Sequence, residues 1–294
     1  MTVQYESFVE KYKTLLDKEL AAAVNVLEAP KVLKESITYS LTAKGKRIRP
    51  ILLFATIDAF NEKPELGMKT ACALEMIHTY SLIHDDLPSM DDDDLRRGIP
   101  TNHKVFGEGF AILAGDGLLT YSFQLIAEDS NLTDKQKLWL IAQLAKSAGP
   151  EGMVAGQVAD IQAENKALQL ADLEYIHHHK TGKLLTFSVL AGALIGGASD
   201  EQLQSLERFS QHIGLAFQIR DDILDVIGDQ NVIGKPIGSD DGKLKCTYPA
   251  LLTLDGAKDH LHKQITEAKT ILQQLNLNSG LLLYLTDLIA GRNN

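Results

Sequence analysis

Apolar residues recur along the whole chain at the spacing of one helix face rather than in the alternation of a strand. Long periodic segments rich in helix-forming residues cover 9–27, 74–86, 110–128, 134–149 and 198–227. The last begins with "SDEQ" at 199–202, which predicts a capped helix start with acidic residues in the first turn. The prolines lie between such segments or suit their first turns, and no Pro/Ser-rich linker divides the 294 residues. The sequence therefore predicts one all-α domain over residues 1–294, with several helices in the centre because they are apolar on more than one face.

Composition narrows the class of protein. Hydrophobic residues make up 45% and charged residues 23%, which is typical of a globular chain. The net charge of −10 disfavours a nucleic-acid or anionic-membrane binder, because both partners reward positive charge. Cys72 and Cys246 lie far apart without a metal-ligand pattern, which predicts reduced thiols. The N-terminus lacks a signal-peptide core and the longest uncharged run, 184–198, is short for a bilayer, so we expect a cytoplasmic protein that does not span a membrane.

Two acidic clusters follow apolar helical segments. The first, "IHDDLPSMDDDDLRRG" at 83–98, holds six carboxylates, and the second is "DDILD" at 221–225. Asp221 and Asp225 lie about 40° apart around a helix and therefore project from one face. Pro88 disfavours helical geometry at the residue before it, so the first helix should end there, and a turn could bring Asp91 back towards Asp85.

Carboxylates gathered in this way are costly unless cations accompany them. Their oxygens suit Mg²⁺, which keeps most of its waters and is usually bound by one or two carboxylates together with substrate phosphates. The expected ligand is therefore a metal–diphosphate unit. Taken singly, each cluster is more commonly a solvated loop or a helix surface, but two of them at the ends of apolar helices favour a binding site.

Basic residues near these clusters supply a second argument. Metals can compensate the charge of one diphosphate, and Lys and Arg can compensate another, although basic residues beside acidic ones could also form weak surface ion pairs. His78 lies about 20° from Asp85 on the helix wheel, two turns earlier. The triple His177–His179 is a poor metal site because neighbouring helical residues point about 100° apart. The basic positions are Lys44, Lys46, Arg47, Arg49, Arg96, Arg97, Lys180, Lys235 and Lys245.

These motifs resemble those of a known family. "GKRIRP", "LIHDDLPSMDDDDLRRGIPTNH", "KTG" and "FQIRDDILDVIGD" followed by "GKPIGSD" are similar to the signature set of the trans-isoprenyl diphosphate synthases, and look most like the bacterial farnesyl diphosphate synthases within it. The resemblance runs from about Gly45 to Pro249 and includes both aspartate-rich motifs in order and spacing. It implies an all-α helical bundle around a central cavity, a single polyprenyl-synthase-like domain and a homodimer.

The resemblance also implies roles for individual residues. Both aspartate motifs would hold Mg²⁺ on an allylic diphosphate, while isopentenyl diphosphate would bind basic residues without metal. The implied Mg²⁺ ligands are Asp85, Asp86, Asp91, Asp221, Asp222 and Asp225, with Asp240 as an indirect support. The implied contacts of the allylic diphosphate are Arg96, Lys180, Thr181, Gln218, Lys235 and Lys245, and those of isopentenyl diphosphate are Lys46, Arg49, His78 and Arg97. Catalysis would depend on Asp85, Asp91, Asp221, Arg96 and Lys180.

The implied chemistry is head-to-tail prenyl transfer. Mg²⁺ and basic side chains stabilise the departing diphosphate, an allylic carbocation forms, the double bond of isopentenyl diphosphate attacks it, and loss of a proton gives a longer allylic product. No side-chain nucleophile is required, and the sequence offers no convincing Ser/His/Asp or Cys/His constellation. An aromatic residue at Tyr80, next to Ser81, together with the two-residue insertion in the first motif is typical of the fifteen-carbon class. Ordinary helix packing is the alternative for Tyr80.

Other functions stay open. Within the enzymes, a geranyl- or geranylgeranyl-diphosphate synthase is the alternative, whereas a terpene cyclase would not need the basic isopentenyl site. A catalytically silent helical subunit of a synthase complex could lose one aspartate motif, and both are complete here. A divalent-cation buffer would not explain the basic positions. Residues 234–245, rich in Gly and Lys, are a candidate lid.

Overall fold

The computed structural model describes residues 2–164, 166–227 and 247–291, and it confirms the all-α prediction. Within these residues the strands are β1 (Leu95–Arg96) and β2 (Ile99–Pro100), which pair antiparallel with Arg96 opposite Ile99. The chain forms two compact units, one of Met1–Phe54 with Lys63–Ala142 and the other of Ala55–Glu62 with Gln143–Asn294. The single domain expected over residues 1–294 therefore stays a prediction.

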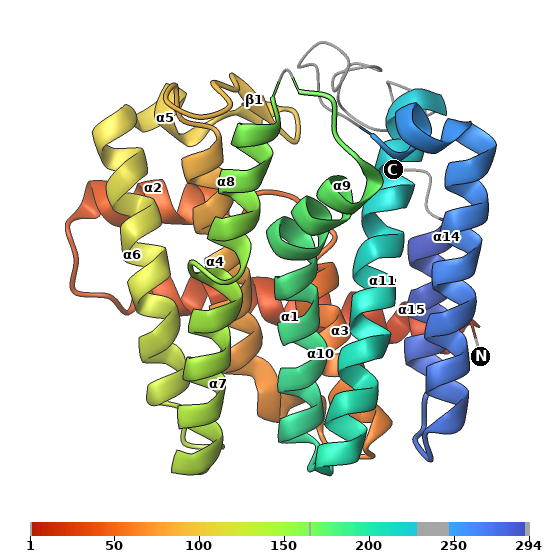
Figure 1. Cartoon of the computed structure of the whole chain (residues 1–294). Helices are drawn as coiled ribbons and strands as arrows, with labels where there is room; N and C mark the ends of the chain where they lie inside the picture. The colour runs from red at the N-terminus through yellow and green to blue at the C-terminus, as the bar shows by residue number, and fades with distance from the viewer. Residues whose placement is uncertain (1, 165, 228–246, 292–294) are drawn as a thin grey trace. The chain divides into compact units, whose positions relative to one another are not determined.

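In the first unit, the helices gather around the packed pair α4 and α6 (Figure 1). Apolar residues of these two helices, such as Leu74, Ile77 and Leu118, are completely buried, and the exclusion of their surfaces from water is the main force that holds such helices together. The helices are α1 (Thr2–Asn25), α2 (Lys31–Leu41), the first part of α3 (Ile48–Ala59), a short 3₁₀ turn (Pro64–Gly67), α4 (Met68–Asp85), α5 (Asn102–Phe106), α6 (Glu108–Ala127) and the first part of α7 (Asp134–Ala148).

The end of α4 is held close to α6. His84 is the last residue but one of α4, and its Nε2 lies 3.1 Å from the carbonyl oxygen of Ile112. A β-carbon at Gly115 would come within 2.5 Å of His84 Cδ2 and nearer still to Nε2. Glycine at this position therefore lets α6 lie directly against the His84 ring, at the end of the helix that carries the first aspartate motif.

The second unit consists of long helices that run beside one another, α10 beside α11, and α14 beside both α11 and α15 (Figure 1). Helix α10 is the central one, because nearly all of its side chains are buried. The elements of the second unit are the ends of α3 and α7, α8 (Met153–Ala163), α9 (Leu170–His177), a π-helical turn called η2 (His178–Gly182), α10 (Lys183–Ile195), α11 (Asp200–Ile227), α14 (Tyr248–Gln274) and α15 (Gly280–Gly291).

Helix α11 carries the second aspartate motif and begins with a capping box. Ser199 Oγ accepts a hydrogen bond from the amide of Gln202 (3.2 Å), and the Gln202 side chain accepts one from the Ser199 amide (2.9 Å). Asp200 and Glu201 lie in the first turn, where the helix dipole favours negative charge. The capped start that the sequence predicts is confirmed, and it fixes the helical register in which Asp221 and Asp225 follow.

Candidate active site

The first aspartate motif is a helix end followed by a tight turn. Helix α4 ends at Asp85, and the amide of Asp91 donates a hydrogen bond of 2.9 Å to the carbonyl oxygen of Asp85. The amide of Asp92 bonds the carbonyl oxygen of Leu87 in the same turn, and Asp92 has a positive φ of 50°. The predicted break before Pro88 and the return of Asp91 to Asp85 are both confirmed.

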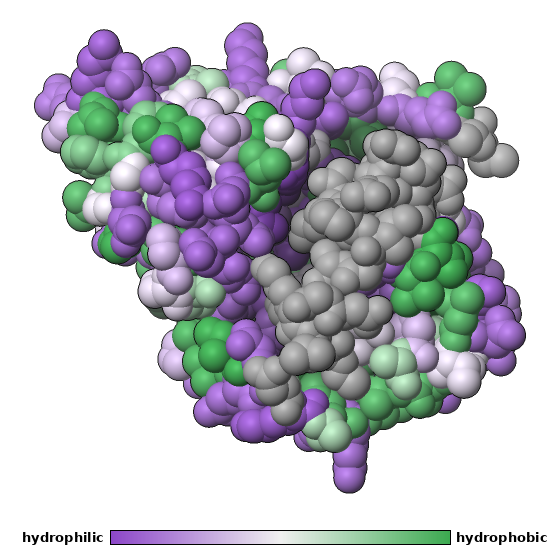
Figure 2. Space-filling model, turned by 90° about the horizontal axis from the view of Figure 1, so that it is seen from above, coloured by the Kyte–Doolittle hydropathy of each residue, from purple (hydrophilic) through white to green (hydrophobic). Residues whose placement is uncertain are grey.

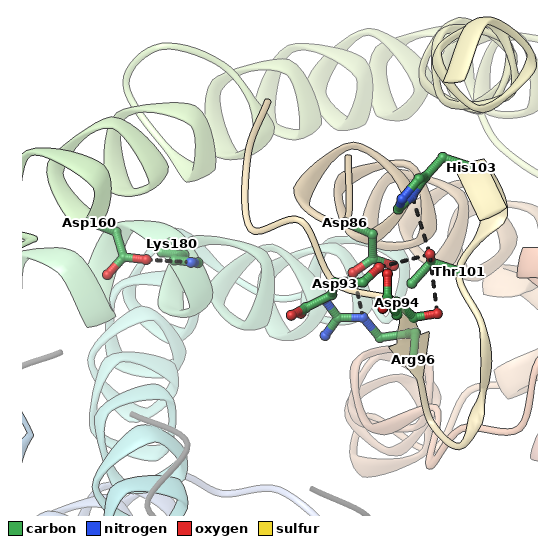
Figure 3. A network of polar contacts seen from close by, with 8 residues as sticks. All are labelled: Asp86, Asp93, Asp94, Arg96, Thr101, His103, Asp160 and Lys180. Atoms are coloured by element: carbon green, nitrogen blue, oxygen red, sulfur yellow. Dashed lines mark hydrogen bonds and ion pairs between the residues drawn. The ribbon is translucent and has the colours of Figure 1, made fainter. Parts of the chain in front are cut away.

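Asp86 and Arg96 form a buried ion pair in the first unit (Figure 3). Asp86 is 3% exposed, its Oδ1 accepts a hydrogen bond of 2.9 Å from Arg96 Nε, and Arg96 Nη2 also contacts Asp86 and, at 3.4 Å, Asp93. Thr101 Oγ1 donates to the carbonyl oxygen of Asp93 (2.8 Å). Asp86 is predicted as a metal ligand and Arg96 as a diphosphate contact, and in the structure they bind each other. Both roles stay predictions.

A basic group combines residues of the loop before α3, the first turn of α3, helix α4 and the turn between β1 and β2. Arg49 Nη1 lies 3.4 Å from His78 Nε2, and Arg97 Nη1 donates to the carbonyl oxygen of Lys44 (3.0 Å). A β-carbon at Gly45 would lie 2.6 Å from Arg97 Nη1, so the guanidinium lies directly against the Gly45 backbone. Burial, together with the charges of Arg49 and Arg97, holds the pKa of His78 well below its usual value, so its imidazole is neutral at pH 7. The structure gathers three of the residues predicted for isopentenyl diphosphate, and Lys46 is exposed on the same loop.

Arg47 lies in this basic segment but is buried as a structural residue. Its φ is 52°, and its side chain is 2% exposed. It donates to Glu75 Oε1 (2.6 Å), to Asp17 Oδ1 (2.9 Å) and to the carbonyl oxygens of Leu41 and Ala43. Because Glu75 lies one helical turn before His78, the Arg47–Glu75 pair fixes the loop between Lys46 and Arg49 against α4. The sequence counted Arg47 among the basic positions, and its burial could not be read from it.

A cavity of about 150 Å³ in the second unit brings four predicted residues together. They come from η2, which carries Lys180 and Thr181, and from α11, which carries Gln218 and Asp222. The complete lining is Asp160, Ala163, Glu164, Leu168, Leu173, Ile176, His177, Lys180, Thr181, Gln218, Asp222 and Thr247. Most of the lining residues are polar or charged, so the cavity suits a polar ligand better than an apolar one.

Within this cavity Asp222 is 6% exposed and already hydrogen bonded. Its Oδ2 accepts a bond of 2.9 Å from the amide of Tyr248 and lies 3.4 Å from His177 Nε2, while His177 Nδ1 lies 3.4 Å from Gln218 Nε2. Asp222 therefore ties the start of α14 to α11. The neighbours Asp221 and Asp225 are partly exposed on the same helix, as a motif that receives a cation requires.

The sequence missed four polar residues of this cavity, Asp160, Glu164, His177 and Thr247, and two of them contact predicted residues. Asp160 on α8 accepts a hydrogen bond of 2.7 Å from Lys180 Nζ (Figure 3). His177 was considered only as part of a histidine tract, whereas here it lies beside Asp222. No periodicity or spacing joins these residues to their partners, since Asp160 is 20 positions from Lys180 and His177 is 45 positions from Asp222. Only the fold brings them together.

Tyr80, the predicted chain-length residue, is 8% exposed on α4. Its ring packs edge to face on His84 with centroids 5.7 Å apart, and Ser81 Oγ donates to the carbonyl oxygen of His78 (2.9 Å). A small cavity of about 30 Å³ in the first unit is lined by Thr79, Asp86 and Arg96 among others, but not by Tyr80. The chain-length role of Tyr80 and Ser81 stays a prediction.

Several predicted residues lie outside the described part of the chain. They are Lys235, Lys245, Asp240, Cys246 and the candidate lid 234–245. In the residues that are described, no three His, Cys, Asp or Glu side chains converge as a ready-made metal site. Mg²⁺ does not need one, because it takes one or two carboxylates and completes its octahedron with water and substrate phosphates. The donor set of the two aspartate motifs fits that ion.

The known proteins that this chain resembles over most of its length are polyprenyl synthetases. Residues 30–277 match the family model of polyprenyl synthetase. The chain is 57% identical to the farnesyl diphosphate synthase of Geobacillus stearothermophilus, covering 98% of this chain and 97% of that protein, and 51% identical to that of Bacillus subtilis strain 168, covering 99% of both. It is 45% identical to the chloroplastic geranylgeranyl pyrophosphate synthase of Capsicum annuum, with 99% of this chain and 79% of that protein covered. The apo structure of an FPP/GFPP synthase from Zymomonas mobilis matches with a TM-score of 0.86 and 34% identity, over 98% of both chains.

The buried Arg47–Glu75 pair generates a stability prediction. Replacing Glu75 with Ala leaves the Arg47 guanidinium buried without its closest carboxylate, and we expect the free energy of unfolding to fall by about 3–5 kcal/mol in urea denaturation. Asp17→Ala is the matched control, because Asp17 binds the same guanidinium but its side chain is 43% exposed, and it should cost no more than about 1 kcal/mol. Equal losses in the two variants would contradict the assignment of Glu75 as the structural partner.

Proposed function

The chain belongs to the polyprenyl synthetase family, and from this we propose that it condenses dimethylallyl diphosphate, and then geranyl diphosphate, with isopentenyl diphosphate to form farnesyl diphosphate. The support for this product is that the relatives with 57% and 51% identity are farnesyl diphosphate synthases, whereas the geranylgeranyl pyrophosphate synthase of Capsicum annuum is 45% identical. The single observation that carries the reaction class is the cavity that gathers Lys180, Thr181, Gln218 and Asp222.

We propose that both aspartate motifs bind Mg²⁺ through Asp85, Asp86 and Asp91 of the first unit and Asp221, Asp222 and Asp225 of the second. These six carboxylates differ in how far they are exposed to solvent, and we propose that they also differ in role. Asp86 and Asp222 are buried and bonded to Arg96 and to the Tyr248 amide, so besides binding Mg²⁺ they would fix the backbone on which the more exposed Asp85 and Asp221 are presented. When bound, Mg²⁺ supplies the positive charge that a departing diphosphate needs.

The basic residues divide by the diphosphate that they would hold. Lys46, Arg49, His78 and Arg97 would bind isopentenyl diphosphate, and the neutral His78 would do so as a hydrogen-bond partner rather than as a charge. Arg96, Lys180, Thr181 and Gln218 would contact the allylic diphosphate, as would Lys235 and Lys245 outside the described residues. This assignment is supported by the closeness of Arg49 Nη1 to His78 Nε2 and by the contact of Arg97 with the Lys44–Gly45 backbone.

In this proposal the protein provides charge and position rather than a nucleophile. Arg96 and Lys180 stabilise the negative charge that develops on the departing diphosphate, so the allylic C–O bond breaks to give a delocalised cation. The double bond of isopentenyl diphosphate, held by the basic group of the first unit, forms the new C–C bond. A proton then leaves the adjacent carbon, and the released diphosphate is the base that accepts it.

We further propose a soluble cytoplasmic homodimer in which α6 faces its counterpart. Among the described residues, α6 is the helix that is long and apolar enough to cross a membrane, and only 39% of its apolar window is buried. Phe110, Ile112 and Leu113 are exposed on it. Green residues appear among purple ones on the left of Figure 2, the side where Figure 1 labels α5 and α6. A second copy of the chain would cover this apolar surface.

The second candidate function is a longer-chain synthase. It is favoured by the similarity to the FPP/GFPP synthase of Zymomonas mobilis, whose name gives two products of different length. A catalytically silent subunit is the candidate from another class. Both differ from the proposed function in the products that form from isopentenyl and dimethylallyl diphosphate.

The reaction is tested by product analysis. We expect the purified chain to convert labelled isopentenyl diphosphate and dimethylallyl diphosphate into a fifteen-carbon product. Asp85→Ala and Asp221→Ala should each lower the turnover number by at least about a hundredfold, because each removes a carboxylate that would hold the compensating cation. Asp134→Ala, which changes a fully exposed carboxylate on α7, is the control. Helical circular dichroism should stay unchanged in all three variants, and full activity of Asp85→Ala would remove the metal assignment.

The product length tests Tyr80 separately. If Tyr80 limits the growing chain, replacing Tyr80 with Ala should shift the main product from fifteen to twenty carbons, because removing the ring opens space beside His84. Chromatography of the dephosphorylated alcohols measures this shift, and Tyr284→Ala on α15 is the control for loss of a tyrosine elsewhere. An unchanged fifteen-carbon product would assign the length limit to other residues.

Light scattering coupled to size exclusion tests the dimer. Two chains of 32.3 kDa are expected in solution, and Leu113→Asp should give single chains because it places a charge in the apolar surface of α6. Leu138→Asp on α7, where the leucine is 71% exposed, should leave the dimer intact. Sedimentation of the wild-type chain with lipid vesicles would instead support membrane contact by α6.

A further inference from the structure

Lys180 lies on an unusual piece of backbone. Residues His178–Gly182 form the π-helical turn η2 between α9 and α10, and this turn carries both Lys180 and Thr181 to the cavity of the second unit. A π turn is rare, occurs mostly as a single turn within α-helical structure, and is frequent at functional sites. Because η2 carries Lys180, the residues packed against it influence where the Lys180 ammonium lies.

Two glycines on neighbouring helices contact the backbone of η2. A β-carbon at Gly156 of α8 would come within 2.5 Å of Lys180 Cα and nearer still to the Lys180 amide nitrogen. A β-carbon at Gly214 of α11 would lie 3.3 Å from Gly182 Cα. Helix α8 thus approaches the turn more closely than any residue with a side chain would permit, and α11 closes the other contact.

Asp160 lies one helical turn after Gly156 on α8 and holds the end of the same lysine. Lys180 Nζ donates to Asp160 Oδ2 at 2.7 Å, with the two side chains 26% and 18% exposed. One face of α8 therefore contacts Lys180 at both ends, its backbone through Gly156 and its ammonium through Asp160 (Figure 3 shows the ion pair).

We infer that Gly156 and Asp160 are positioning residues that fix Lys180 in the cavity of the second unit before substrate arrives. The inference rests on the proposed function in that the ligand of Lys180 is an allylic diphosphate. A lysine side chain carries about 2 kcal/mol of rotamer entropy, which is lost whenever its ammonium must be held at one point. The face of α8 imposes that order in advance, and the ammonium keeps two further N–H donors for phosphate oxygens.

Gly156→Ala tests the backbone contact. A displacement of about 1 Å in a positioned group can cost a hundredfold in rate, so we expect kcat/KM for dimethylallyl diphosphate to fall at least about tenfold. The KM for isopentenyl diphosphate, whose predicted residues are in the first unit, should stay within about twofold. Gly109→Ala is the matched control, because a β-carbon there meets nothing within 4 Å. Unchanged kinetics in a folded Gly156→Ala enzyme would overturn the inference.

A double-mutant cycle tests the side-chain contact and remains informative if Gly156→Ala does not fold. Asp160→Asn should lower kcat/KM for dimethylallyl diphosphate by roughly three- to tenfold in the wild-type chain, and by less than twofold in the Lys180→Ala chain, because a residue that acts through Lys180 has nothing left to position. Equal losses in both chains would overturn the inference, since Asp160 would then act on the substrate or its cations independently.

A binding measurement separates failure of this inference from failure of the proposed function. The same four chains of the cycle can be titrated calorimetrically with inorganic diphosphate in the presence of Mg²⁺, which requires no turnover. If the wild-type chain makes no prenyl product but Asp160→Asn weakens diphosphate binding only when Lys180 is present, the positioning role stands without the prenyl reaction. Additive effects of Asp160→Asn and Lys180→Ala on binding would reject it.

Discussion

Repulsion among carboxylates is the constraint on which this structure depends. Six of them lie within ten residues of the first motif, and the fold meets part of their charge with its own cations. Arg96 binds Asp86 and Asp93, and Lys104 binds Asp94 at 2.7 Å. In the second motif, the buried Asp222 accepts a hydrogen bond from the Tyr248 amide and lies beside His177. Each motif thus contains one buried carboxylate that binds groups of the protein, and others that are more exposed.

The arginines of the first unit differ in the partners of their guanidinium groups. Arg47 is surrounded by Glu75, Asp17 and two carbonyl oxygens, so its charge is fully used within the fold. Arg49 lies against the imidazole of His78, and Arg97 donates a hydrogen bond to the backbone carbonyl of Lys44. We propose that these two guanidinium groups bind a diphosphate, because the fork of donors matches phosphate oxygens.

Sequence patterns predicted those features that depend on neighbours along the chain. Helical periodicity gave the all-α class, Pro88 gave the turn that returns Asp91 to Asp85, and Ser199 with Gln202 gave the start of α11. The ion pair between Asp160 and Lys180 and the contact of His177 with Asp222 could not be predicted, because no local rule relates positions so far apart. Neither could the π turn at His178–Gly182, which depends on the space that Gly156 leaves.

The central claim is that the acidic motifs hold cations on behalf of a diphosphate. Titration of the wild-type chain with an unreactive analogue of dimethylallyl diphosphate, in Mg²⁺ and again in EDTA, tests it most directly. The account predicts tight binding in Mg²⁺ and a loss of at least about a hundredfold in affinity in EDTA, because the carboxylates would then repel the diphosphate. Equal affinity in the two conditions would contradict it, since the basic side chains alone would then suffice.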